Sequence, residues 1–111
     1  MTEHITLDRA NELLDRAVAE KGADYVYPLA KSGRCLYFDA EGQPSCIVGH
    51  VLHYLGFGPE SVTEGESAED ACRQLGFDDD AADVLDDVQL FQDNGKPWGE
   101  AIALALDGVI A

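Results

Sequence analysis

The segment from Pro44 to His53 gathers the side chains best suited to chemistry, because it contains Cys46 and two of the three histidines of the chain, His50 and His53. At 100° per residue these three side chains fall within an arc of about 60° on one side of a predicted helix. The apolar residues of the segment cluster on the opposite side. We therefore expect the cysteine and the histidines to lie away from the core.

A nucleophilic interpretation pairs Cys46 with His50. A thiol in the first turn of a helix has its pKa lowered by the helix dipole, and a histidine one turn later could act as its base. A cysteine that opens an apolar helix loosely resembles papain-like peptidases, but in those folds the base comes from a later segment, and no histidine follows His53. The sequence names neither an orienting acid nor an oxyanion donor for this reaction.

A metal interpretation joins either Cys46 and His50 or His50 and His53 to Cys35, and His4 could complete the set, which gives plausible zinc ligand types. Cys46 and His53 would lie about 10 Å apart along the helix axis, so one metal ion could not easily bind all three helix residues. No CxxC or HxxxH pair supports the site. The third interpretation is that Cys46 packs as a small apolar residue and the imidazoles bond to neighbouring backbone.

Negative charge is concentrated in the second half of the chain. Twelve of the thirty-four residues from Glu60 to Asp93 are acidic and only Arg73 is basic, so this stretch carries 1 − 12 = −11 of the total net charge of −15. Such a field repels nucleic acid and anionic lipid and attracts basic partners. We expect no direct binding to nucleic acid and no membrane-surface role. An acidic face that serves only solubility is the alternative.

A helix predicted from about Asp79 to Gln92 separates charge from core, with Asp79, Asp83, Asp86 and Asp87 gathered on one face. Carboxylates one turn apart lie roughly 6 Å apart, which is similar to the phosphate spacing along a nucleic-acid strand. A nucleic-acid-mimicking inhibitor is therefore an alternative function. An EF-hand calcium loop fails here, because an alanine occupies an expected ligand position and no glycine follows.

Five short helices are predicted. Thr6 and Ser67 cap the first and the third helix, Ser45 caps a second helix that begins at Cys46, and Gly residues in two Leu-Gly-Phe sequences end the second and third helices. The expected ranges are 7–21, 46–55, 68–75, 79–92 and a last helix that opens at Pro97. Gly49, inside the second helix, predicts the close approach of another backbone, within the fold or across a homodimer interface.

The β-favouring runs Tyr25–Tyr27 and Cys35–Phe38 predict one small hairpin. The expected fold class is α+β and mainly α, with about five helices packed on that hairpin. The chain has 111 residues and 46% hydrophobic residues, which suits a single domain over 1–111. Its first residues lack the apolar run of a signal peptide, and three cysteines are an odd number, so we expect reduced thiols and a cytoplasmic location.

Three blocks of the sequence carry a resemblance: 24–28 (DYVYP), 44–52 (PSCIVGHVL) and 92–101 (QDNGKPWGEA). They resemble a family of small uncharacterised proteins from actinobacteria and their phages. The middle block is the most specific. The resemblance implies an intracellular accessory protein, and the family supplies no established activity or catalytic residue.

Together these observations predict a non-enzymatic acidic accessory protein, phage or prophage derived, that binds a basic surface on a host or phage protein and needs no cofactor. Trp98 could contribute to this surface as an exposed aromatic side chain, or it could fix the start of the last helix on the core. The alternatives are a nucleic-acid-mimicking inhibitor and a small zinc or thiol protein centred on Cys46 and His50.

Overall fold

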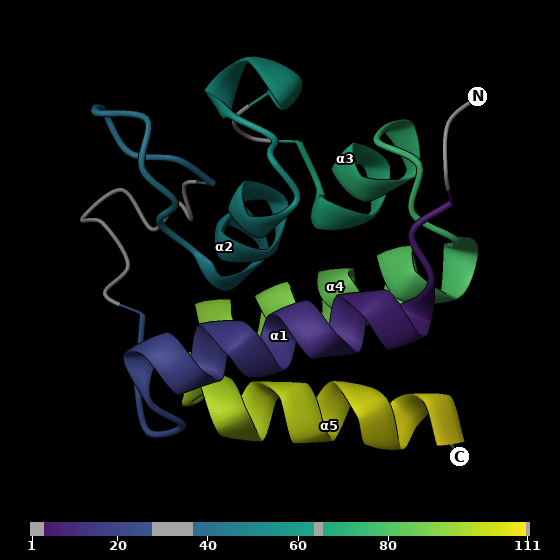
Figure 1. The fold of residues 1–111 in the computed structure, drawn as a ribbon. Coiled ribbons are helices and arrows are strands. Elements are labelled where there is room, and N and C mark those ends of the chain that lie inside the picture. Colours follow the sequence, from purple (N-terminus) through teal and green to yellow (C-terminus); the bar gives the residue numbers. More distant parts are fainter. Residues whose placement is uncertain (1–3, 28–36, 64–65, 111) are drawn as a thin grey trace.

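The computed structural model of the protein describes residues 4–27, 37–63 and 66–110 (Figure 1). These residues are mostly helical, as predicted. The helices are α1 (Leu7–Lys21), α2 (Ile47–Tyr54), the 3₁₀ helix η1 (Pro59–Ser61), α3 (Ala68–Gln74), α4 (Asp79–Asp93) and α5 (Trp98–Ile110). No helix in these ranges combines the length and the apolar character needed to cross a membrane.

The predicted caps of α1 and α3 are confirmed. The Thr6 hydroxyl accepts a hydrogen bond from the amide of Arg9 at 3.2 Å, and the Ser67 hydroxyl accepts one from the amide of Asp70 at 3.2 Å. Each bond satisfies an amide that has no partner inside its helix. At the other end of α1, Gly22 has φ = 100°, a backbone conformation that ends the helix and that favours glycine.

The cap of α2 differs from the prediction by one residue. Cys46, and not Ser45, stands at the N-cap, and its sulfur accepts a hydrogen bond from the amide of Gly49 at 3.4 Å. The Ser45 hydroxyl is instead hydrogen-bonded to the hydroxyl of Tyr27 at 2.6 Å. A serine is the better cap by local preference, but here the Ser45 hydroxyl is engaged in this tertiary contact.

The two Leu-Gly-Phe sequences end α2 and α3 in the same way, as predicted. Gly56 and Gly76 have φ angles of 90° and 99°. In each case the amide of the following phenylalanine donates to the carbonyl five residues earlier, at 3.0 Å. This is the Schellman pattern, in which a left-handed glycine lets the next residue fold back on the last turn.

The hairpin predicted from Tyr25–Tyr27 and Cys35–Phe38 is not supported. The described residues contain no β-strand and only two isolated bridges, one of which joins the end of the second run to Pro44. The first two residues of that run lie outside the described ranges. The backbone of Tyr25 is used elsewhere, because its carbonyl accepts a hydrogen bond from the amide of Trp98 at 2.9 Å. The Tyr25–Tyr27 segment therefore holds the first turn of α5 in place and does not pair as a strand.

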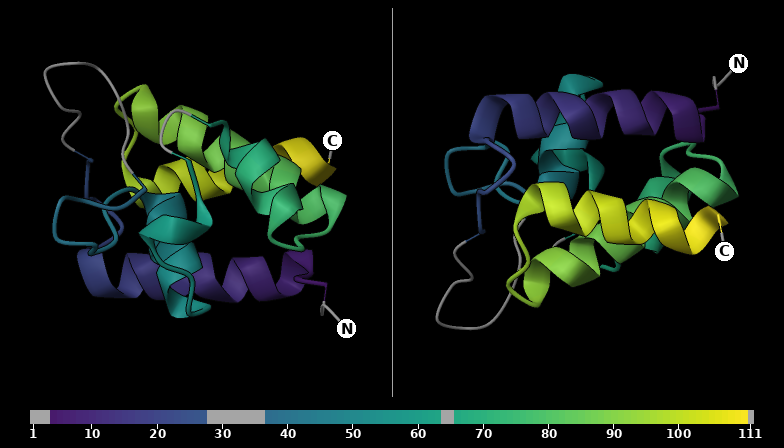
Figure 2. Two further views of the ribbon diagram at one scale, coloured as in Figure 1. Left: turned by 90° about the horizontal axis from the view of Figure 1, so that it is seen from above. Right: turned by 90° about the horizontal axis from the view of Figure 1, so that it is seen from below.

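Helices α4 and α5 lie side by side and run in opposite directions, and α1 packs across both (Figures 1 and 2). Helix α2 packs on α1 and α4, and α3 packs on the first half of α4. The core between them is apolar apart from a few polar side chains. Its largest fully buried members include Trp98, Leu14, Ile47, Leu52, Leu85, Gln92 and Val88.

Gly49 confirms the prediction of a close backbone approach. A Cβ atom built on this glycine would overlap the carbonyl oxygen of Tyr37. The neighbouring backbone therefore belongs to the same chain, and it covers the glycine face of α2. A homodimer that used this face would have to displace the Tyr37 segment first.

Candidate functional site: an acidic face on α3 and α4

Helices α3 and α4 carry a continuous set of acidic side chains on their outer surface, which we call the acidic face. The residues of α4 that belong to it fall within an arc of about 120°, opposite the buried side of the helix. The acidic face consists of Glu69, Asp70, Asp79, Asp80, Asp83, Asp86 and Asp87.

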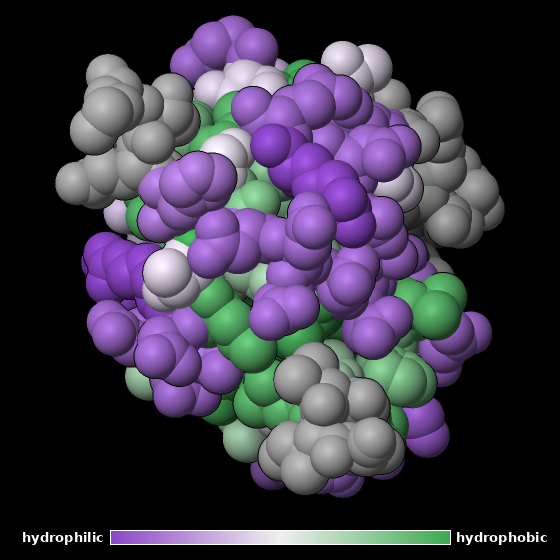
Figure 3. All heavy atoms as spheres, turned by 90° about the vertical axis from the view of Figure 1, so that its right-hand side faces the viewer, coloured by the Kyte–Doolittle hydropathy of each residue, from purple (hydrophilic) through white to green (hydrophobic). Residues whose placement is uncertain are grey.

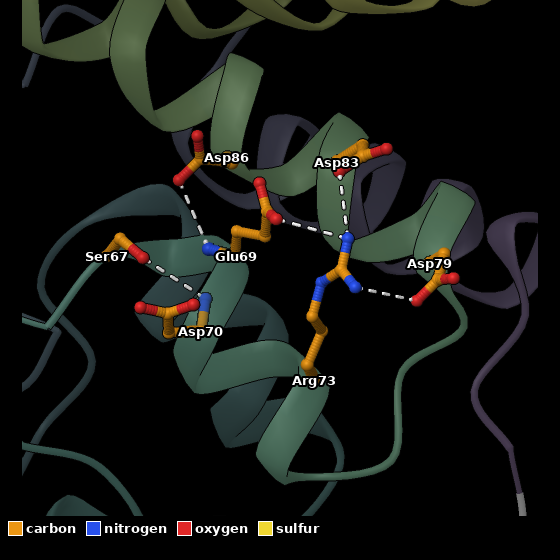
Figure 4. Close-up of polar contacts among 7 residues, drawn as sticks. All are labelled: Ser67, Glu69, Asp70, Arg73, Asp79, Asp83 and Asp86. Carbon is orange, nitrogen blue, oxygen red and sulfur yellow. Dashed lines mark hydrogen bonds and ion pairs between the residues drawn. The ribbon is translucent and has the colours of Figure 1, made fainter.

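Arg73 of α3 lies at the centre of the acidic face. Its guanidinium forms ion pairs with Glu69 at 3.1 Å, with Asp79 at 3.0 Å and with Asp83 at 3.5 Å (Figure 4). The first pair lies within α3, and the other two cross to α4. One cation thus joins the two helices, so Asp79 and Asp83 also hold the fold together.

Asp86 makes a second connection between the same helices. Its carboxylate accepts a hydrogen bond from the backbone amide of Glu69 at 3.1 Å, in the first turn of α3 (Figure 4). Amides at this end of a helix lack internal partners and favour negative charge. A side chain from α4 therefore helps to cap α3, together with Ser67.

The remaining members of the acidic face are freer. Asp70, Asp80 and Asp87 are exposed, and their carboxylates make no hydrogen bond or ion pair within the described ranges. Partial burial raises the pKa of Asp87, and the neighbouring charges of Asp86 and Asp83 raise it further. The ionised form of Asp87 is therefore disfavoured in the free protein. A positive charge on a partner would relieve the repulsion.

Figure 3 views the molecule from the side on which α3 and the start of α4 lie. Hydrophilic side chains cover most of this side, and a smaller hydrophobic area lies in its lower half. The charge of the acidic face itself is 1 − 7 = −6 when Arg73 is included. The surface offered to a partner is thus polar and strongly negative.

Trp98 is not part of the acidic face. Its side chain is fully buried, with its ring edge-to-face against Tyr25 at 4.8 Å and against His50 at 5.1 Å between ring centres. The prediction that Trp98 contacts a partner is therefore not supported, and the packing alternative describes it. The reason is that the first turn of α5 is held inward by the bond from the amide of Trp98 to Tyr25.

Cys46 and His50 lie inside the core, contrary to the expectation that they face away from it. Both are buried, as are the five other residues of 47–52. The helical pattern assumed one buried side, whereas α2 is covered on several sides, by α1, by α4 and by the Tyr37 backbone. Only His53 of this set is exposed.

The local bonds of these two residues are structural. The sulfur of Cys46 accepts hydrogen bonds from the amide of Gly49 and from the side-chain amide of Gln89, each at 3.4 Å. The Nδ1 atom of His50 lies 2.9 Å from the carbonyl oxygen of Cys46. Burial lowers the pKa of His50, although this hydrogen bond opposes the shift, so the imidazole is neutral at pH 7.

This arrangement gives little support to the zinc or thiol alternative. Of its five residues, Cys35 lies outside the described ranges, Cys46 and His50 face the core, and His53 faces solvent. His4 lies 3.1 Å from a carboxylate oxygen of Asp78. The part of the chain that the structure describes contains no group of three or more His, Cys, Asp or Glu side chains that could hold a metal ion. Burial also raises the pKa of the Cys72 thiol, which keeps it protonated.

Sequence reasoning missed Arg73 as the centre of the acidic face. One signal was available, because Glu69 and Arg73 are four residues apart on a predicted helix, where opposite charges meet. The ion pairs of Arg73 with Asp79 and Asp83 depend on how α3 packs against α4, so no local sequence pattern predicts them.

No family model matches the chain, and neither the curated proteins nor the solved structures contain a match to it.

Proposed function

We propose that the protein is a non-enzymatic acidic binding protein, and that its acidic face engages a basic surface on a partner protein. The observation that carries this proposal is a set of three exposed carboxylates, Asp70, Asp80 and Asp87, that make no hydrogen bond or ion pair within the described ranges. They lie beside a network that joins α3 to α4. The resemblance of three sequence blocks extends the proposal to an accessory role in the cytoplasm, with a phage or prophage origin.

Charge complementarity would govern both the specificity and the rate of binding. Repulsion among the aspartates of α4 destabilises the free protein, and a basic partner would remove this cost on binding. Arg73 and Asp86 hold α3 against α4 before the partner arrives, so little ordering is needed. We expect fast association at low salt and a steep loss of affinity as salt rises, because exposed charges are screened beyond about 10 Å at 0.1 M.

Nucleic-acid mimicry is a second candidate, and the straight run of α4 favours it. Asp79, Asp83 and either Asp86 or Asp87 follow one another at single helical turns, roughly 6 Å apart. A basic surface that normally binds a nucleic-acid backbone could accept such a row. The partner would then be a DNA- or RNA-binding protein, and duplex DNA would compete with this protein for it.

The test compares two variants that carry the same net charge. The face variant replaces Asp70, Asp80, Asp83 and Asp87 with Asn. It keeps Asp79 and Asp86, which connect α4 to α3. The control variant removes four exposed charges that lie off the acidic face, by D15N, D24N, E41Q and D107N. Both have a net charge of −15 + 4 = −11.

Immobilised wild-type and variant proteins are then exposed to host lysate at low salt, with and without excess duplex DNA. The proposal predicts a basic protein that the wild type and the control variant retain and the face variant does not. Displacement of that protein by DNA would select mimicry. Equal retention by all three proteins, or equal loss from both variants, would contradict a role for the acidic face.

A further inference from the structure

A polar hollow of about 460 Å³ lies between the end of α1, α2 and the turn at 39–44. The end of α1 and the turn at 39–44 lie on the side of the molecule away from α3 (Figures 1 and 2). We call the hollow the α1–α2 pocket. Charged and hydrogen-bonding side chains dominate its lining, chiefly Arg16, Glu20, Lys21, Asp39, His53 and Tyr54.

The two carboxylates of the α1–α2 pocket are already engaged. Glu20 accepts a hydrogen bond from the Tyr54 hydroxyl at 2.6 Å, and one oxygen of Asp39 accepts the backbone amides of Glu41 and Gln43 at 2.9 and 3.0 Å. Burial raises the pKa of Tyr54, and the hydrogen bond to Glu20 adds to the shift, so the phenol remains a donor. Because Glu20 and Asp39 already accept these hydrogen bonds, they are less able to bind a cationic ligand.

The basic side chains of the pocket remain available. Lys21 makes no ion pair within the described ranges, and its Nζ lies 5.4 Å from the centre of the Tyr25 ring. The guanidinium of Arg16 lies 4.1 Å above the Tyr54 ring and reaches Glu20 only through Nε, at 3.9 Å. Its terminal nitrogens form no hydrogen bond in the same ranges. His53 is exposed and likewise donates no hydrogen bond there.

This availability sets the α1–α2 pocket apart from the rest of the described surface. Of the five lysines and arginines in the described ranges, Lys21 alone has no ion pair there. The other four are paired with carboxylates: Arg9 with Glu12, Arg16 with Glu20, Arg73 with its three partners, and Lys96 with Glu100. Within the pocket, Arg16 and Lys21 balance Glu20 and Asp39, so the formal charge is 2 − 2 = 0 in a chain of −15.

We propose that the α1–α2 pocket binds a small anion that carries a carboxylate or phosphate group. The terminal nitrogens of Arg16 provide the planar fork that pairs with two oxygens of such a group. Lys21 supplies a second positive charge, and His53 supplies a ring N–H donor. The volume suits a small metabolite or a single side chain or chain terminus.

Titration of ¹⁵N-labelled protein with inorganic phosphate, and separately with citrate, tests this inference at an ionic strength held constant with sodium chloride. The inference predicts saturable shifts at the amides of Lys21, His53 and Tyr54 with at least one anion. The Kd is expected to rise at least fivefold in K21Q and in H53N. The matched variant K96Q removes one positive charge outside the pocket and should leave the Kd unchanged.

The two anions distinguish the group that is recognised, because saturation by phosphate alone selects a phosphate ligand and saturation by citrate alone selects a carboxylate ligand. Linear shifts with both anions would overturn the proposal. Equal weakening in K21Q and K96Q would overturn it too, because binding would then follow net charge. The face variant should bind the anion as the wild type does, so this result is independent of the acidic-face proposal.

Discussion

Replacing Arg73 with Gln is expected to destabilise the fold and to strengthen partner binding at low salt. Arg73 is the only basic residue from Glu60 to Asp93, and it pairs with three carboxylates, two of them across the α3–α4 contact. Glutamine keeps most of the side-chain length and removes the charge. Asp79 and Asp83 would then repel each other and Glu69 without compensation.

The size of the stability loss follows from the exposure of the ion pairs. Arg73 is 42% exposed and Asp79 is 79% exposed, so each pair is screened by solvent. An exposed ion pair contributes roughly 0.2–1 kcal/mol, and three that share one cation reach about 1–2 kcal/mol in total. In a domain of this size about 1 kcal/mol lowers the Tm by roughly 4–8 °C. At 1 M salt, where the Debye length is about 3 Å, most of the loss should disappear.

Urea denaturation of the wild type and R73Q at low salt and at 1 M salt measures this effect. R9Q is the matched control, because among the described residues Arg9 pairs only with Glu12, on one exposed helix face. We expect a loss of about 0.5 kcal/mol or less. The reasoning would be refuted if R73Q and R9Q lost the same stability, or if the loss in R73Q did not depend on salt. The opposite signs predicted for stability and for binding separate the structural role of Arg73 from the function of the acidic face.

Three further substitutions test particular contacts. In G49A the new Cβ overlaps the Tyr37 carbonyl, so despite the helix preference of alanine we expect a loss of about 1–3 kcal/mol in urea denaturation; wild-type stability would contradict the close approach. In D87N we expect a gain of roughly 0.2–0.5 kcal/mol at pH 7, because the raised pKa means that ionisation of Asp87 costs folding energy above that pKa; the gain should vanish at acidic pH, where the aspartate is protonated. His50 has a lowered pKa, so the folded state binds fewer protons than the unfolded state and the wild type should lose stability from pH 7 to pH 5. H50N should lose less over this range, and identical pH profiles in the wild type and H50N would contradict the burial of His50.

The helices could be predicted from sequence because their limits are local. Thr6 and Ser67 cap by reaching amides three residues later, and a left-handed glycine closes each Leu-Gly-Phe turn. The close approach at Gly49 was also readable, since a glycine in an apolar helix needs a packing reason. The sequence did not show which backbone segment approaches Gly49, because the contact with Tyr37 depends on tertiary packing.

The cysteine and histidine side chains show where local reasoning fails. A helical projection places Cys46 and His50 opposite the apolar side, and it assumes that the opposite side faces water. Helix α2 is only 8 residues long and is enclosed, so this assumption is wrong. The acidic face was predicted as a set of charges on α4, but the role of Asp86 in capping α3 depends on the packing of two helices.

The most direct test of the central claim is the affinity of the retained partner for the wild type, the face variant and the control variant, measured by calorimetry at two salt concentrations. The account predicts that the face variant binds at least tenfold more weakly at low salt and that the control variant, with the same net charge of −11, binds within about twofold of the wild type. Equal affinities for the two variants would contradict it, because binding would then follow total charge and not the arrangement of carboxylates on α3 and α4.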